Sequence, residues 1–496
     1  MIDEGEPSSR IRAPRLDVAV DGQFAGTLTP ALRHELVGWA FLPLAALAMA
    51  GVMALLIALM RIPGAETVMP WTTQEFFERG LITHVTLAFV VWYLGIQGAL
   101  TVLVTAKDLH QSNLQLAGWG VFFGRCGLYS AAAGLVAMLI PALSNLGDAI
   151  LNNYIPILSH PLFYGGLALV ALGLVMTILR LLVLTRAHRT SEPLTLGVAA
   201  SGVIFLIALV CFAVAWATRP LEFDPAAVNE YVVWGGGHVL QFANTALFFC
   251  AIYVLARITL GETPVSSRMF KLAMVLLTAG SAAGPLLYLT YAPGDAEQRE
   301  MFTNLYWYVL PLPGALVMLG LTALLFRRRA DIGRGAPELI AILVAMGLFA
   351  YGGAIGFFES SVDTRTPGHY HAMLIAVTLA FMALYFALFL PVLERRTERR
   401  RLRTWMYGLL GTGQFLHSSA LFLAGMFGVA RKVAGSNQGL DSWPKIASMA
   451  VMGLGGVIAV VGGVIFIVLA LRMLLRAKTG PTSVSAALGA GMNAAE

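Results

Sequence analysis

Charged side chains are scarce in this chain of 496 residues. Only 12% of the residues are Asp, Glu, Lys or Arg, whereas 58% are hydrophobic and the mean hydropathy is +0.76. Soluble globular domains do not have such a composition. The first thirty residues are polar, so the chain also lacks the apolar core of a secretory signal peptide at its start. The composition excludes a soluble enzyme and indicates a protein that lies largely within a lipid bilayer.

Cysteine is equally scarce. Cys126, Cys211 and Cys250 stand alone within apolar runs, and their spacing suggests neither a disulfide nor a zinc site. The Cys-x-x-Cys-His motif for covalent heme attachment does not occur. The net charge of +6 does not imply binding to nucleic acid, because the distribution of charge matters more than its sum in a membrane protein. We therefore expect the lipid bilayer, and no nucleic acid, among the partners.

Long apolar runs dominate what is present, and each is long enough to span a bilayer as a helix. There are twelve, at residues 35–60, 81–105, 117–140, 157–185, 194–218, 232–257, 269–291, 304–326, 337–358, 368–393, 404–430 and 445–475. The sequence therefore predicts an all-α membrane protein. We expect a twelve-helix membrane domain over residues 34–478, an N-terminal tail at 1–33 and a C-terminal tail at 479–496.

The basic residues give the orientation. If loops alternate between the two sides, 24 of the 33 Lys and Arg residues fall on the side of the termini and 8 on the other, while Arg125 lies inside a run. Cytoplasmic loops carry such an excess of basic residues. We expect both termini in the cytoplasm and the protein in a membrane such as the bacterial inner membrane.

Four histidines share one depth in this topology. His84 lies near the start of the second run, His238 near the start of the sixth, and His369 and His371 near the start of the tenth. Ionisable groups inside a membrane are costly and are usually functional. Histidines at a common depth on three distant helices are what a buried metal or heme site requires. His417, in the eleventh run, is left without an assignment.

The His369-Tyr-His371 pair has its own geometry. A helix turns about 100° per residue, so these two imidazoles point about 200° apart, to opposite faces. Two histidines that bind one metal would be four residues apart instead. The pair therefore favours two neighbouring cofactors that share one helix, although two polar residues at a membrane interface remain the simpler interpretation.

This arrangement of twelve helices, with histidines on the second, sixth and tenth, resembles the catalytic subunit I of the heme–copper oxidase superfamily. That superfamily includes cytochrome c oxidases and nitric oxide reductases. The resemblance implies two hemes: His84 and His371 would bind the iron of a low-spin heme, and His369 the iron of a high-spin heme. Two axial imidazoles saturate the iron and favour electron transfer, whereas a single one leaves a face open for a gas.

Two further motifs carry the resemblance. Trp234-Gly-Gly-Gly-His238 looks like the motif on the sixth helix that holds the second metal, so His238 is the candidate catalytic residue. Arg431-Lys432, after the eleventh run, resembles the basic pair that binds the heme propionates. The resemblance therefore makes both basic residues cofactor-binding candidates.

The seventh run departs from this family. The superfamily carries adjacent histidines there, whereas this chain reads Gly284-Pro285-Leu286-Leu287-Tyr288. Leucine cannot bind a metal, and non-heme iron prefers two histidines and a carboxylate. His238 alone offers too few ligands, so we expect the second metal, copper or non-heme iron, to be absent or unusual.

These observations leave three hypotheses open. The first is a heme-binding oxidoreductase subunit of respiratory electron transfer, which reduces or binds oxygen or nitric oxide at the high-spin heme. The second is a non-catalytic diheme protein for electron transfer or gas sensing. The third is a transporter, for which the sequence offers no convincing internal repeat. Electrons would have to come from a separate subunit, a cytochrome c or a quinol.

Overall fold

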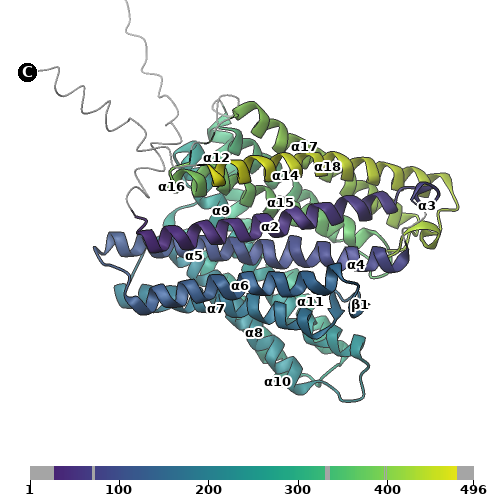
Figure 1. Ribbon diagram of the computed structural model, residues 1–496, viewed down its shortest axis with the longest axis horizontal. Coiled ribbons are helices and arrows are strands. Elements are labelled where there is room, and N and C mark those ends of the chain that lie inside the picture. The colour runs from purple at the N-terminus through teal and green to yellow at the C-terminus, as the bar shows by residue number, and fades with distance from the viewer. Residues whose placement is uncertain (1–26, 70–72, 330–335, 396, 398, 477–496) are drawn as a thin grey trace, which may run out of the picture.

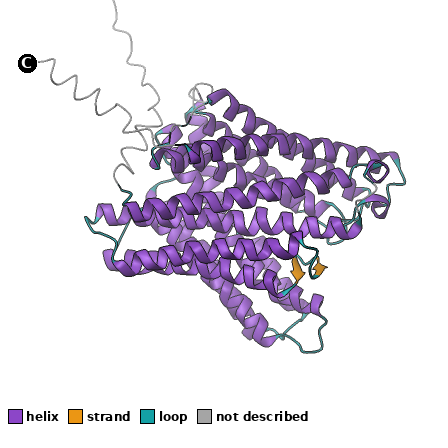
Figure 2. Cartoon of the chain, in the orientation of Figure 1, coloured by secondary structure: helices purple, strands orange, loops and turns teal. Residues whose placement is uncertain are grey.

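Long helices lying side by side make up the protein (Figure 1). The computed structural model describes residues 27–69, 73–329, 336–395, 397 and 399–476. Within these residues the strands are one short antiparallel pair, β1 (Asp148–Ile150) and β2 (Ile157–Ser159), shown in orange in Figure 2. The all-α membrane architecture expected from the sequence is confirmed.

Twelve long helical segments form the bundle within the described residues. They are α2 (Pro30–Met60), α4 (Gln74–Val85) with η1 (Thr86–Val91) and α5 (Trp92–Gln111), α6 (Gly118–Leu143), α7 (Pro161–His188), α8 (Pro193–Thr218), α9 (Pro225–Leu260), α10 (Ser267–Thr290), α11 (Ala296–Asn304) with η2 (Leu305–Val309) and α12 (Pro311–Arg327), α14 (Pro337–Gly356), α15 (Arg365–Leu384) with η3 (Tyr385–Phe389) and α16 (Leu390–Val392), α17 (Arg400–Met426) and α18 (Trp443–Leu475). The short helices α3 (Ala65–Val68) and η4 (Gly435–Gln438) lie in connections.

Eleven of these segments are long and apolar enough to cross a membrane, counted over the described residues. The remaining one, α17, has 27 residues and begins with the polar sequence Arg-Arg-Leu-Arg, and it packs against α15 and α18. Helices satisfy their own backbone hydrogen bonds, which is why they can span lipid. The protein is therefore an integral membrane protein.

Three segments occupy the centre of the bundle. In the most apolar stretch of α4–α5, α9 and α15–α16, the buried share of residues is 89%, 94% and 83%, whereas it is 33–50% in the other eight apolar spans. These central segments are the second, sixth and tenth helices, which carry the four predicted histidines. Side chains on them are surrounded by protein on most sides, as a buried cofactor site requires.

The central helices begin earlier than their apolar runs. α4 begins at Gln74, where the Thr73 side chain accepts a hydrogen bond from the backbone N–H of Phe76. α9 begins at Pro225, after the capping residue Asp224. The polar first turns hide these starts from a search for apolar runs. His84 and His238 therefore lie deeper along their helices than the sequence suggested.

In the part of the chain that the structure describes, three π-helical segments interrupt the regular helices. η1 follows His84 after one residue, η2 contains Tyr306, and η3 lies near the opposite end of the tenth helix. Such segments insert an extra residue into a helical turn and are frequent at functional sites. Two of the three lie beside the histidines described below.

Candidate functional site

His84 is held in a defined orientation by α2. Its Nδ1 lies 3.0 Å from the carbonyl oxygen of Ala50. A carbonyl oxygen only accepts hydrogen bonds, so Nδ1 carries the hydrogen and Nε2 presents its lone pair. The ring is half-buried, so part of it is left uncovered by protein. One nitrogen of His84 is therefore available to a metal.

His371 and His417 lie together on two neighbouring helices. Nδ1 of His371 donates to the carbonyl of Pro367 at 2.7 Å, and Nδ1 of His417 donates to that of Met452 at 2.9 Å. The two ring centroids are 4.9 Å apart, and both rings interact electrostatically with His84. We call His84, His371 and His417 the first histidine group. Each member presents Nε2, with Nδ1 tied to backbone.

Arg61, directly after α2, borders this group. Its guanidinium donates to the Gln438 side chain at 3.3 Å and interacts electrostatically with Tyr370, His371 and His417. Burial lowers its pKa to about 10, so it remains positive at neutral pH. A buried positive charge needs an anionic or hydrogen-bonding partner. Its two hydrogen-bond acceptors, the Gln438 side chain and the carbonyl of Ala430 at 3.2 Å, are both neutral, so Arg61 is a candidate partner for carboxylates beside the first histidine group.

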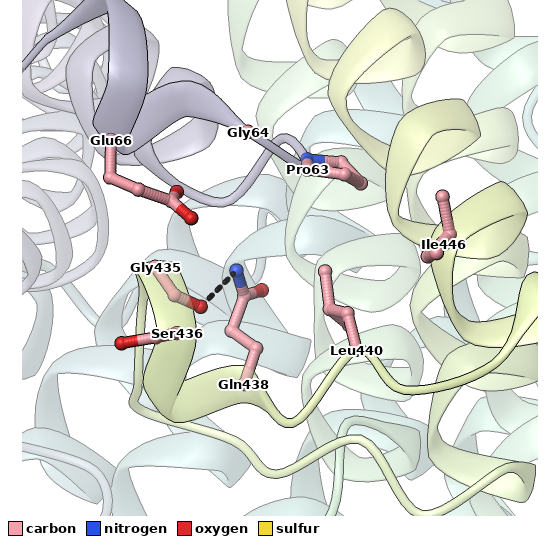
Figure 3. Close-up of a pocket in the computed structure, with 8 residues that line it drawn as sticks. All are labelled: Pro63, Gly64, Glu66, Gly435, Ser436, Gln438, Leu440 and Ile446. Carbon is pink, nitrogen blue, oxygen red and sulfur yellow. Dashed lines mark hydrogen bonds between the residues drawn. The ribbon is translucent and has the colours of Figure 1, made fainter.

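A pocket opens beside Gln438, the residue to which Arg61 donates a hydrogen bond (Figure 3). It has a volume of about 340 Å³ and lies between the connection after α2 and the connection from α17 to α18. Its wall contains Pro63, Gly64, Glu66, Gly435, Ser436, Gln438, Leu440 and Ile446. The Gln438 amide points into it and donates to the carbonyl of Gly435 at 3.3 Å. The pocket combines polar groups with an apolar wall, near the first histidine group.

The predicted basic pair lies at the same end of the bundle. Arg431 donates to the side chain of Asn153, and Lys432 donates to the carbonyl of Leu151, so both hold the connection between β1 and β2. Arg431 also interacts electrostatically with Tyr370. Burial lowers the pKa of Lys432 to about 8. The pair is half-buried and turned toward the protein, within reach of the residue before His371.

His369 faces a different neighbour from His371. Its Nδ1 donates to the carbonyl of Gly352 on α14 at 2.7 Å, and Gly356 makes room for the ring, because an added Cβ there would lie 2.6 Å from Nδ1. Its Nε2 lies 3.4 Å from the hydroxyl of Tyr306 on η2. That distance is long for an O–H donor. The nitrogen that would bind iron therefore contacts a phenol.

His238 lies on the other side of Tyr306. Its Nδ1 donates to the carbonyl of Trp234 at 2.8 Å, and only 2% of the residue is exposed. Aromatic rings surround the imidazole, with centroid distances of 4.7 Å to Tyr154, 4.9 Å to Trp234, 6.0 Å to Phe302 and 6.4 Å to Tyr306. We call His238 and His369, joined through Tyr306, the second histidine group.

The Gly-Gly-Gly run before His238 makes room for this aromatic shell. A Cβ added at any of the three glycines would lie within 2.5 Å of an aromatic side chain. The neighbours are Tyr288 and Phe302 at Gly235, Phe212 at Gly236 and Tyr154 at Gly237. Burial raises the pKa of Tyr154 well above its ordinary value, so its phenol keeps its proton. The motif therefore positions rings around His238.

The leucines of α10 are placed differently from one another. Leu286 is 58% exposed on the outside of the bundle, and Leu287 is half-buried. The residue of α10 that reaches the aromatic shell is Tyr288, whose ring centroid lies 5.3 Å from that of Phe302. Leu286 therefore points away from the bundle, and the expectation that both leucines stand at a metal position stays a prediction.

Glu230 is the nearest carboxylate to His238 along α9, and other groups engage it. It accepts hydrogen bonds from Asn152 and Asn153 and lies 3.5 Å from the guanidinium of Arg299. In the described part of the chain, no three His, Cys, Asp or Glu side chains come together in a way that could hold a metal ion. These described residues therefore offer no complete set of protein ligands for a metal ion without a porphyrin.

The predicted residues thus fall into two groups. His84 and His371 share one, bordered by Arg431, and His369 and His238 share the other. Sequence reasoning missed Arg61, Tyr154 and Tyr306, and it left His417 unassigned. The aromatic run Tyr306-Trp-Tyr308 was the available signal for Tyr306, whereas nothing local marks Arg61.

Comparisons with known proteins identify relatives over most of the chain. The family model described as Cytochrome C and Quinol oxidase polypeptide I matches residues 36–473. An uncharacterized protein of Rickettsia prowazekii is 26% identical over 487 residues, covering 86% of this chain and 94% of that protein. An uncharacterized protein of Aquifex aeolicus is 25% identical over 354 residues, covering 70% of this chain and 83% of that one.

A solved structure shares the fold. A chain of a heme–copper terminal oxidase dimer, determined by cryo-electron microscopy, superposes with a TM-score of 0.74 at 17% sequence identity. The match covers 91% of this chain and 85% of the other. At this identity the likeness concerns the fold alone.

Proposed function

Because the chain belongs to the family of cytochrome c and quinol oxidase polypeptide I, we propose that it passes electrons through a low-spin heme bound by His84 and His371. We further propose that it reduces or binds a small gas, oxygen or nitric oxide, at a high-spin heme bound by His369. The family consists of heme-containing membrane oxidoreductases of respiration. The observation that carries the proposal is that His84, His369 and His371 each donate a hydrogen bond from Nδ1 to a backbone carbonyl, which leaves Nε2 free of hydrogen as a possible ligand.

The first histidine group fits a heme. Each imidazole donates Nδ1–H to a carbonyl oxygen and leaves Nε2 as the metal ligand, an arrangement that orients metal-binding histidines in general. His84 and His371 are half-buried, so space remains beside both rings. Neutral imidazole is a common ligand of heme iron. When bound, the heme would supply a one-electron carrier.

The chain's own residues would do three things for this heme. His84 and His371 would hold the iron from two helices. Arg61, Arg431 and Lys432 would pair with its propionates, because buried carboxylates need charged partners. The apolar faces of the central helices would exclude water, and the hydrogen bonds from Nδ1 to backbone carbonyls would keep both imidazoles in one protonation state.

The second histidine group fits a heme less well. His369 presents the right nitrogen, but the Tyr306 hydroxyl lies 3.4 Å from it, on the side where iron would bind. A heme on His369 therefore requires Tyr306 to move. His238 would then face the gas from the aromatic shell, as the candidate catalytic residue without a second metal.

These contacts favour a second candidate function, a non-catalytic protein for electron transfer or gas sensing. Tyr306 closes the His369 position, and the aromatic shell fills the surroundings of His238. A chain that keeps only the first heme could carry electrons without turning over a gas.

For partners and orientation, we propose an electron donor that is a cytochrome c or a quinol, and termini on the cytoplasmic side. The pocket of Figure 3 is our candidate for the approach of the donor, because it adjoins the partner of Arg61. The bias of basic residues supports the orientation. Reporter fusions at both termini test it, and a periplasmic signal from either end would reject it.

The decisive experiment is a heme and metal analysis of the purified protein, combined with reduced and carbon-monoxide difference spectra and turnover with oxygen and nitric oxide. Two hemes, a carbon-monoxide signal and turnover support gas reduction. One low-spin heme without carbon-monoxide binding supports electron transfer. Loss of the low-spin spectrum in His84→Ala supports the ligand assignment, and a protein without heme rejects both functions.

A further inference from the structure

His417 has no role in the function proposed so far, yet it lies beside a proposed heme ligand. It is 8% exposed within α17, and its ring centroid lies 4.9 Å from that of His371, with 52° between the ring planes. Side chains of this kind are rare inside membrane helices because burying their polar atoms is costly. A third imidazole beside His84 and His371 therefore needs an explanation.

Close helix packing fixes the position of His417. A Cβ at Gly455 of α18 would lie 2.6 Å from the backbone nitrogen of His417, so the two helices touch at that level. On the other side of α17, the Ser418 hydroxyl donates to the carbonyl of Gly368 on α15. His417 thus sits between two tight contacts, and its backbone has little freedom to move away from His371.

A purely structural role explains only one of the two ring nitrogens of His417. Nδ1 joins α17 to α18 through the carbonyl of Met452. No hydrogen bond among the described residues uses Nε2 of His417, which in the neutral ring is an acceptor. This atom is not among the buried side-chain nitrogens and oxygens that lack a partner in the described residues, so Nε2 of His417 lies at a surface that the surrounding side chains leave uncovered. A residue needed only to join two helices would not require this second nitrogen.

We propose that His417 is a reserve axial ligand of the low-spin heme, able to take the place of His371. The porphyrin occupies four positions around iron and leaves one on each face. If His84 takes one face, His371 and His417, lying side by side, share access to the other. The exchange breaks one iron–nitrogen bond, forms another, and moves no electron or proton. This inference rests on the low-spin heme of the proposed function.

The test compares four variants of the full-length protein by electron paramagnetic resonance and resonance Raman spectroscopy of the ferric heme. We expect His371→Ala to keep a six-coordinate low-spin heme. We expect the double variant His371→Ala/His417→Ala to become high-spin and to bind carbon monoxide when reduced. His417→Phe should stay low-spin through His371. His110→Ala, at an exposed position, controls for loss of any histidine.

A gain-of-signal variant covers the case in which the double variant does not fold. In His371→Ala/His417→Met, a methionine ligand should raise the reduction potential above that of His371→Ala, as histidine–methionine ligation does in cytochromes. A His371→Ala protein that is already high-spin, or a potential that His417→Met leaves unchanged, overturns the proposal. A wild-type protein without heme rejects the proposed function instead, so the two failures are distinguishable.

Discussion

Tyr306 is the residue whose replacement tests the second histidine group most directly. Its hydroxyl lies 3.4 Å from Nε2 of His369, against about 2.7–2.8 Å for the commonest hydrogen bonds of hydroxyl donors. Such a bond contributes about 0.5–1 kcal/mol, at the low end of the range for a neutral pair. Its loss in Tyr306→Phe should therefore favour iron at His369 by a factor of about 2–5.

The assay is high-spin heme content and carbon-monoxide binding to the reduced protein at controlled heme supply. Tyr306→Ala, which also removes the ring, should raise both quantities further than Tyr306→Phe. The matched control is Tyr308→Phe, two residues along, because that side chain is 77% exposed. Tyr308→Phe should match the wild type in both quantities. If both Tyr306 variants also match the wild type, the Tyr306 hydroxyl does not restrict iron binding at His369 and the reasoning fails.

Three further predictions concern the described contacts elsewhere in the bundle. Glu35→Ala should destabilise the protein by about 3–5 kcal/mol in denaturant titrations, because it leaves the fully buried guanidinium of Arg180 without the carboxylate that lies 2.7 Å away. Equal stability of Glu35→Ala and the wild type would contradict this. Gly237→Val should cost about 1–3 kcal/mol by colliding with Tyr154, seen as a lower thermal midpoint that Tyr154→Gly partly restores. Burial lowers the pKa of Lys432 from 10.5 to about 8, so the unfolded chain binds the proton of this side chain more tightly than the folded protein does. The free energy of unfolding of the heme-free protein should therefore rise between pH 8 and 10.5, and Lys432→Met should remove the rise.

The sequence was informative about the fold for a physical reason. Apolar runs of membrane length predict helices directly, and the shared depth of His84, His238 and His371 follows once the helices are counted. The helix starts were less accurate, because the first turn of α4, beginning at Gln74, is polar and resembles a loop. A span is read from hydropathy, whereas a start depends on capping contacts such as that of Thr73.

From the sequence, the candidate site could be proposed only through its histidines and the basic pair Arg431-Lys432, whose roles stay predictions. Tyr306, which reaches His369, lies in the π-helical segment η2, and no local pattern in the sequence indicates such a segment. Arg61 and His417 approach His371 from opposite ends of the sequence, through packing of α2, α17 and α18. Leu286 turned outward for a similar reason, since the face that a helix presents depends on its neighbours.

The hydrogen bonds from the histidines to backbone carbonyls would limit which of these histidines can be replaced during evolution. Ala50, Gly352 and Met452 tie three imidazoles to helices other than their own, so these histidines also act as staples between helices. A lineage that loses a metal would still lose packing if it replaced them. The presence of such a histidine in a relative would therefore indicate the packing of the bundle as much as a bound heme.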